Sequence, residues 1–157
     1  MASLKSFKDK VLLAKQFSLS DWLALVEAWW LLFFFYLALH RISYERLLNS
    51  THPILENPPE PSPVLFFAHQ IKRLVGFAAR LHLIPVTCLV KSLTLQKMLS
   101  KRNIPAQIRI GTKKIQDAIY AHAWVEVNGK PIGEADDIAQ KFNVLESAVE
   151  LYSRQFI

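Results

Sequence analysis

The only cysteine, one histidine and a group of carboxylates follow one another in an order that could support acyl transfer. Cys88 stands at the start of a predicted helix, and His122 lies in a predicted strand. Three acids, Glu134, Asp136 and Asp137, come just past the next turn. A thiolate nucleophile, a histidine that accepts and returns its proton, and an acid that orients the histidine form a cysteine-dependent triad. The order therefore predicts an acyl-transfer site on an α+β scaffold.

The helix predicted from Cys88 to about Lys101 has Thr87 in position to cap it. A cysteine in the first turn lies near unpaired backbone N–H groups and the positive end of the helix dipole, which favour the nucleophilic thiolate. The alternative is that Cys88 is a small buried apolar residue, as lone cysteines commonly are. Helical spacing predicts two sides, Cys88, Ser92, Leu95 and Leu99 on one, and Lys91, Thr94, Lys97 and Lys101 on the other.

His122 belongs to the second of two predicted strands. Residues 106–110 alternate as a strand that ends at Gly111, and residues 112–118 are predicted as a polar loop. Residues 119–127 alternate again, with His122, Trp124 and Glu126 on one face and only apolar residues on the other. Because His122 faces away from the wholly apolar side, core packing does not explain it; the alternative is an exposed strand histidine. The Asn128-Gly129 pair predicts a hairpin that returns over residues 130–133.

The N-terminal part reads as helical. Residues 1–17 mix lysines with apolar residues and predict a short amphipathic helix. A second helix begins at Ser18 or Ser20 and runs to about residue 39, with Glu27 its only charge after the first turn. A membrane span needs roughly 20 apolar residues, and this run falls slightly short; no signal-peptide cleavage site follows it. The pattern favours a helix buried against its own domain, a partner or a membrane surface.

The remaining pattern divides the chain into three parts. Prolines at 53, 58, 59, 61 and 63 deny the backbone its helix donors and predict a connector. The predicted parts are a helical region at 1–52, the connector at 53–63 and a catalytic domain at 64–157, which opens with a helix over 64–83. One cysteine among 157 residues excludes an internal disulfide and fits a reducing compartment. We therefore expect a cytoplasmic protein, with membrane association left open by the apolar helix.

The net charge of +6 comes entirely from the second part of the chain, where residues 65–157 hold thirteen basic and seven acidic residues. No acid lies between Pro61 and Gln116. The run predicts either a solvated basic face or a docking surface for an acidic peptide or partner, and nucleic acid is disfavoured because aromatics are not interleaved with the charges. The basic residues are Lys72, Arg73, Arg80, Lys91, Lys97, Lys101, Arg102, Arg109, Lys113 and Lys114.

Metal chemistry is not predicted. His69 and His82 lie on the helix at 64–83 without a histidine or glutamate partner at ligand spacing, and His-Glu-x-x-His does not occur. Isolated histidines on helices are usually surface or packed residues. We therefore expect no metal and no cofactor.

Three segments together resemble a known family. They are Thr87 to Leu95, Ile108 to Gly111, and the run Ala-His-Ala-Trp-Val-Glu-Val-Asn-Gly at 121–129. In this order and spacing they resemble the transglutaminase-like cysteine peptidases of lasso-peptide maturation, in the stand-alone short form without a fused leader-recognition domain. The likeness covers about residues 86–137. The N-terminal apolar helices are similar in character but less specific.

The resemblance implies a papain- or transglutaminase-like core, in which a cysteine-bearing helix packs on a small antiparallel sheet, preceded by an N-terminal hydrophobic helical region. It also implies removal of the leader from a ribosomally made precursor, after which a separate ATP-dependent cyclase closes the ring on the freed amine. Cys88 would be the nucleophile and His122 the general base and acid. The implied partners are the precursor peptide, a separate leader-recognition protein and the lasso cyclase, with no nucleic acid.

The third triad member depends on the hairpin at Asn128-Gly129. The family usually places aspartate about where Glu134 stands, so the chain departs from the pattern there. A strict two-residue turn leaves Glu134 on the face opposite His122, whereas one extra residue, a bulge, brings it onto the His122 face. We favour Glu134 as the acid, followed by Asp136 and then Asp137.

Two other functions remain open from the residues. The same triad could transfer the acyl group to an amine instead of water, as a transglutaminase does. A non-enzymatic, membrane-associated adaptor is also compatible with the apolar run at 29–39.

Overall fold

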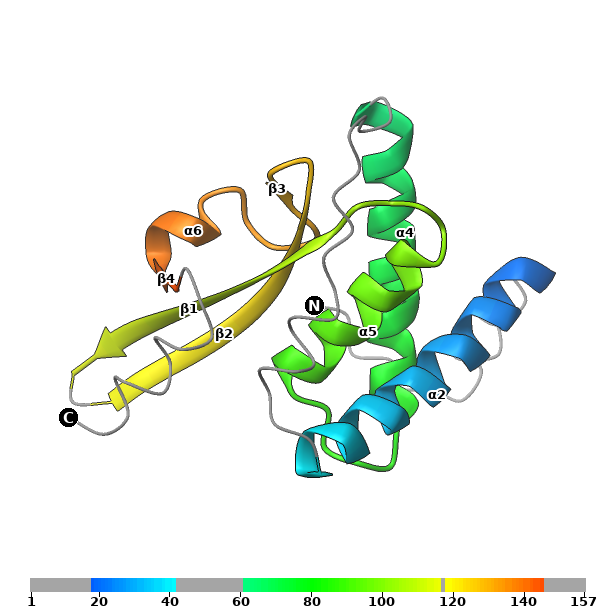
Figure 1. Cartoon of the computed structure of the whole chain (residues 1–157), viewed down its shortest axis with the longest axis horizontal. Coiled ribbons are helices and arrows are strands. Elements are labelled where there is room, and N and C mark those ends of the chain that lie inside the picture. The colour runs from blue at the N-terminus through cyan, green and yellow to red at the C-terminus, as the bar shows by residue number, and fades with distance from the viewer. Residues whose placement is uncertain (1–17, 42–60, 117, 146–157) are drawn as a thin grey trace, which may run out of the picture.

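The computed structural model describes residues 18–41, 61–116 and 118–145. It is an α+β fold, as predicted (Figure 1). The helices are α2 (Leu19–Arg41), α4 (Pro61–Leu81), α5 (Cys88–Ser100) and α6 (Ile138–Lys141), and the strands are β1 (Gln107–Ile115), β2 (Ala118–Val127), β3 (Lys130–Pro131) and β4 (Asn143–Val144). The predicted amphipathic segment at 1–17 lies outside these residues.

The strands form an antiparallel sheet in the order β3-β2-β1-β4, with α5 between the sheet and the other long helices. Because α5 contacts β2 on one side and both α2 and α4 on others, it is buried nearly all round. Thr94 was predicted on the same side as the lysines, yet its exposed fraction is 0%, because other elements pack around α5. Only a few positions such as Lys91 and Lys97 reach solvent.

Helix α2 opens with a reciprocal cap. The backbone N–H of Asp21 donates to Oγ of Ser18 at 3.2 Å, and the backbone N–H of Ser18 donates to Oδ2 of Asp21 at 3.0 Å. Of the three predicted ways to cover this apolar helix, burial against its own fold holds for one side, which consists of Ala24, Leu25, Ala28, Leu32, Phe35 and Ala38. Glu27 binds Lys101 and Arg102 at the end of α5, each at 2.9 Å.

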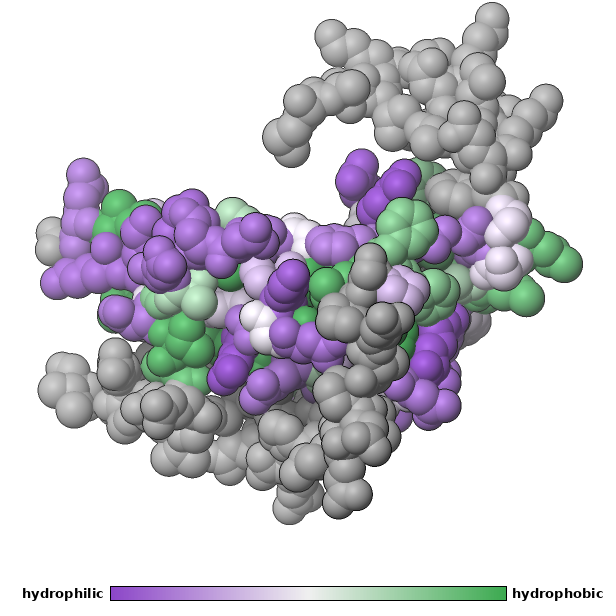
Figure 2. Space-filling model, turned by 90° about the horizontal axis from the view of Figure 1, so that it is seen from above, coloured by the Kyte–Doolittle hydropathy of each residue, from purple (hydrophilic) through white to green (hydrophobic). Residues whose placement is uncertain are grey.

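The opposite side of α2 is an apolar stripe that stays exposed. Figure 2 shows apolar side chains uncovered at the end of the molecule where α2 begins. By length and composition, α2 could cross a membrane, although a third of its most apolar window is buried. A core helix passes the same test, so this is weak support for membrane association. The stripe consists of Leu19, Leu23, Val26, Trp30, Phe34 and Leu37.

The predicted connector ends earlier than expected, because α4 begins at Pro61. Proline suits the first turn of a helix, where its missing N–H has no partner to lose. Residues 42–60 lie outside the described part, so the three-part division of the chain stays a prediction. Side chains of α2, α4, α5 and β2 belong to one hydrophobic core.

The sheet is longer than predicted. Residues 112–118 were expected to form a loop, but β1 continues to Ile115 and β2 starts at Ala118. This part of the strand lacks an alternating apolar pattern, because Lys113 and Lys114 are consecutive polar residues and both are exposed. Backbone pairing with β2, which continues to the Ile115–Ala118 pair, holds the segment extended.

Candidate active site

Cys88 is positioned by the start of α5. The backbone N–H of Val90 donates to Oγ1 of Thr87 at 3.3 Å, which confirms Thr87 as the predicted cap. The thiol is a free cysteine and is half-buried. It therefore stands where first-turn backbone N–H groups are closest and where a substrate could reach it.

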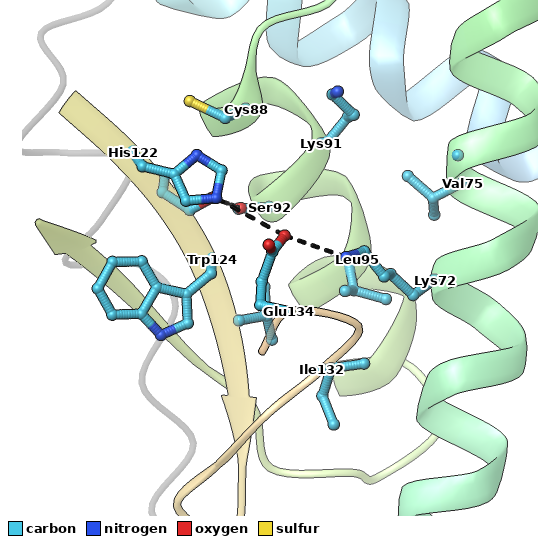
Figure 3. A pocket seen from close by; sticks show the side chains of 13 residues that line it. Lys72, Val75, Cys88, Lys91, Ser92, Leu95, His122, Trp124, Ile132 and Glu134 are labelled. Carbon is cyan, nitrogen blue, oxygen red and sulfur yellow. Dashed lines mark hydrogen bonds and ion pairs between the residues drawn. The ribbon is translucent and has the colours of Figure 1, made fainter. Parts of the chain in front are cut away.

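One cavity of about 110 Å³ brings the three predicted site residues together. Cys88, His122 and Glu134 all line it, although they come from α5, β2 and the loop after β3. Helix α4 closes the cavity with Lys72 and Val75. Figure 3 shows Cys88 and Glu134 on different sides of the His122 ring.

The two nitrogens of His122 face different partners. Nε2 lies 3.6 Å from Oε1 of Glu134, an ion-pair distance that is too long for a hydrogen bond. In Figure 3 the other ring nitrogen lies on the side of Cys88. The ring is stacked beside Trp124 with 6.2 Å between ring centres, and Phe142 lies 5.7 Å away. This arrangement could pass a proton between the thiol and a leaving group while the carboxylate stabilises the charged ring.

Glu134 also forms an ion pair with Lys72, a residue that was not predicted to lie in the site. Nζ of Lys72 lies 3.1 Å from the same Oε1 of Glu134 and donates to the carbonyl of Gly133 at 2.6 Å. Lys72 therefore ties the acid-bearing loop to α4. Nothing in the sequence signals this pair, because its members are 62 residues apart.

The route by which Glu134 reaches His122 differs from the prediction. Asn128 and Gly129 both have positive φ, 51° and 72°, which is typical of a strict two-residue turn, and Val127 pairs with Lys130. The expectation that Glu134 needs a bulge in this turn is wrong. The strand ends instead at Pro131, and the chain turns at Gly133, whose φ is 69°. That second bend brings Glu134 into the cavity.

The two alternative acids do not line the cavity. Asp136 and Asp137 are both exposed. Oδ1 of Asp137 lies 2.8 Å from Nζ of Lys141, and the hydrogen bond to Lys141 holds the pKa of this carboxyl below its usual value. Glu134 is thus the predicted acid that the fold brings to His122.

The sequence profile of the transglutaminase-like superfamily matches residues 29–147. The chain belongs to this superfamily. The match includes the second half of α2 and every described strand, so this part of the apolar helix belongs to the family region.

A second comparison concerns a single relative. The chain is 38% identical over 58 residues to the microcin J25-processing protein McjB of Escherichia coli. The alignment covers 37% of this chain and 27% of that protein, so the chain spans well under two thirds of the relative. No solved structure matches significantly. Together the two findings confirm the predicted resemblance to transglutaminase-like proteins of lasso-peptide maturation.

In this transglutaminase-like chain, buried polar contacts fasten the strand that carries His122. Oγ of Ser92 on α5 donates to the carbonyl of Ala123 at 3.0 Å. Trp124 is 2% exposed, and its Nε1–H donates to Glu126 at 2.9 Å. The sequence placed Trp124 away from the apolar face, yet it is buried because Phe142 packs over it. Both faces of β2 are therefore covered next to the site.

The two isolated helix histidines, His69 and His82, do not line the cavity. His69 is exposed, and His82 stacks on Trp29 with 4.6 Å between ring centres. Among the residues described for this superfamily member, no three His, Cys, Asp or Glu side chains gather as a metal-binding group.

Proposed function

We propose that the chain is a cysteine peptidase that removes the leader from a lasso-peptide precursor through Cys88, His122 and Glu134. The main observation in support is that His122 lies between Cys88 and Glu134 in one cavity. Membership of the transglutaminase-like superfamily and similarity to a microcin J25-processing protein support the assignment. The proposal would place the protein with its precursor in the cytoplasm.

The reaction has two halves. In the first, His122 takes the proton of the Cys88 thiol, the sulfur attacks the scissile carbonyl, and the protonated ring gives its proton to the leaving amine. This releases the core peptide and leaves the leader as a thioester on Cys88. In the second, His122 takes a proton from water, which attacks the thioester and releases the leader carboxylate and the thiol.

Two groups would stabilise the charges that develop. Glu134 would face the imidazolium, and its 3.6 Å separation from Nε2 would shorten when the ring is charged. The backbone N–H of Cys88, in the first turn of α5, would donate to the oxyanion of the tetrahedral intermediate.

Incubation with candidate precursor peptides, with and without a candidate partner, tests the proposal. Mass analysis should detect separate leader and core peptides with the native chain and only intact precursor with Cys88→Ala. Equal cleavage by the two proteins would remove Cys88 from the reaction and overturn the proposed mechanism.

Acyl transfer to an amine is the second candidate, favoured by the superfamily to which the chain belongs. Both reactions share the thioester intermediate. Adding a primary amine in excess separates them, because a transferase yields a leader amide of higher mass, whereas a peptidase yields the free carboxylate. A non-enzymatic adaptor would yield neither, and its Cys88 would react slowly with a thiol probe near neutral pH.

We also propose that a separate leader-recognition protein delivers the precursor and that it docks on the apolar stripe of α2. The opposite side of this helix is buried in the protein. Helices that lie in a membrane surface carry basic residues on their polar face. No Lys or Arg lies between Leu19 and His40, so a protein partner fits the stripe better than a membrane surface does. Four of the ten basic residues in the acid-free run are already paired: Lys72, Lys101, Arg102 and Arg109. The basic run is therefore a less continuous docking surface than the stripe.

Trp30→Ser with Phe34→Ser tests the docking site, since both side chains are mostly exposed, at 60% and 57%. The double variant should lose partner-stimulated cleavage and keep the slow cleavage seen without partner. Efficient cleavage by the native chain alone, unimproved by any partner, would contradict the idea. Binding of the native chain to lipid vesicles, lost in the variant, would assign the stripe to a membrane instead.

A further inference from the structure

Strand β2 extends far beyond its partner β3. The two pair only at Glu126–Pro131 and Val127–Lys130, followed by one hydrogen bond from the N–H of Ile132 to the carbonyl of Val125 at 2.8 Å. On its other side β2 pairs with β1 over its length, from Ala118 to Glu126. From Ala118 to Trp124, one edge of β2 therefore has no strand beside it among the described residues.

The register identifies which backbone groups point to that edge. In an antiparallel ladder, alternate residues direct both their N–H and their C=O away from the neighbouring strand. The carbonyl of Val125 does so, because it accepts from Ile132 outside the β1 ladder. By alternation, Ala123, Ala121 and Ile119 also point outward. Among the described residues, the outward groups of Ile119 and Ala121 form no hydrogen bond, whereas the carbonyl of Ala123 accepts from Ser92.

The open edge carries none of the usual protection. Natural proteins blunt exposed edges with prolines, charges, bulges or very short strands. Residues 118–121 read Ala-Ile-Tyr-Ala and are all exposed, with Ile119 at 67% and Tyr120 at 53%. In Figure 1 this end of the β1–β2 hairpin projects away from the three long helices. An uncharged, extended edge of this kind is a template for another strand.

The edge also leads directly into the candidate site. Ala121 precedes His122, and the Ser92 contact at Ala123 closes the free edge beside the cavity. The start of α5, which carries Cys88, packs against β2 at this level. A peptide lying along the edge would therefore pass from Ile119 to the thiol in an extended conformation.

We propose that the peptide substrate binds by β-augmentation, adding as a strand to the edge of β2 through the backbone groups of Ile119 and Ala121. The inference rests on the proposed peptidase function and adds the mode of recognition. Main-chain pairing holds a peptide extended, as a scissile bond must be, and selects for conformation more than for side chains. It also accounts for a site whose cavity is small.

Proline substitution gives a matched test. In Ile119→Pro the missing N–H faces only the open edge, so the ladder to β1 is kept. Lys114 lies directly across from Ile119, and its N–H points to the opposite side of the hairpin. Lys114→Pro is therefore a control of equal position and equal strain. We expect Ile119→Pro to raise KM roughly three- to tenfold through loss of one backbone hydrogen bond, with Lys114→Pro close to native.

The probe is a synthetic peptide centred on the scissile bond that the precursor experiment maps, with single backbone N-methyl groups placed along it. Pairing with an edge predicts loss of cleavage at alternate positions on one flank, because only every second N–H faces β2. In Cys88→Ala, the amides of Ile119 and Ala121 should gain protection from hydrogen exchange when the unmodified peptide is added, and that of Lys114 should not.

The outcomes separate this inference from the proposed function. Absence of any Cys88-dependent cleavage overturns the peptidase assignment and the inference together. Cleavage that is equally sensitive to Ile119→Pro and Lys114→Pro, or insensitive to N-methylation, overturns the inference alone. Protection of Ile119 and Ala121 before any peptide is added would also overturn it, since the edge would then be covered by the chain itself.

Discussion

The two sides of His122 are built differently. On one side, Cys88 stands on regular structure, because Thr87 caps α5 and Ser92 fastens the helix to β2. On the other side, Glu134 sits in an irregular loop that is held by Lys72 and bends at Gly133. Cys88 is thus fixed by elements that the whole fold stabilises, whereas Glu134 is held by two contacts from Lys72.

This difference suggests a division of roles. A nucleophile must be held closely against the base, since small misplacements reduce the rate strongly. In the proposed triad, Glu134 would act through the histidine and would tolerate a looser position, which is consistent with its 3.6 Å separation from Nε2. We therefore expect substitutions on the Cys88 side to abolish turnover and substitutions on the Glu134 side to reduce turnover only in part.

The largest effect should come from the cysteine–histidine pair. His122→Ala and Cys88→Ala should each lower kcat/KM by at least about 10³-fold, because each removes a bond-making or proton-transferring group. The double variant should be no worse than either single one, since the two groups act as a unit. Cleavage kinetics test this, with circular dichroism to establish folding. Multiplying losses in the double variant would mean that the two residues act separately.

Glu134→Gln comes next. The variant keeps the shape of the side chain and removes the charge that faces His122, so kcat/KM should fall about 10- to 100-fold. Asp136→Asn is the matched control, because Asp136 is exposed and does not line the cavity. A loss in Asp136→Asn that equals the loss in Glu134→Gln would transfer the role to another acid.

The same contrast explains which features of the fold and the site could be predicted from the sequence. The Thr87 cap, the α5 helix, the β2 strand and the Asn128-Gly129 turn are local features, and each was predicted from neighbouring residues. The bend at Gly133 was not predicted, because the Lys72 side chain that holds it comes from α4, 61 residues away along the chain. Burial of Thr94 likewise follows from helices that pack around α5, which no single stretch encodes.

Gly133→Ala sharpens the comparison on the loop side. Both Gly133 and Gly129 have positive φ, so alanine should destabilise the fold by about 1 kcal/mol at either position. Nothing lies within 4 Å of a Cβ at Gly129, whereas at Gly133 Lys72 must move. Only Gly133→Ala should therefore lower kcat/KM, by about tenfold, through displacement of the Lys72–Glu134 pair. Equal kinetics in the two variants would show that the loop position does not depend on Lys72.

Glu27→Gln should leave activity nearly unchanged and reduce stability, since Glu27 binds α2 to the far end of α5. Burial raises the pKa of Glu27, but hydrogen bonds and charges from Lys101 and Arg102 outweigh it, so the pKa lies below its usual 4.5. A lowered folded-state pKa contributes stability above the unfolded-state pKa, and this contribution is lost as pH falls through the folded-state pKa.

Glu27→Gln should therefore lower the free energy of unfolding by about 1 kcal/mol at pH 7, with the difference shrinking towards about pH 3. Urea unfolding at both pH values measures this, with Asp136→Asn as an exposed control that should not change stability. A difference from the native chain that persists undiminished at low pH would mean that Glu27 acts through packing and not through its charge.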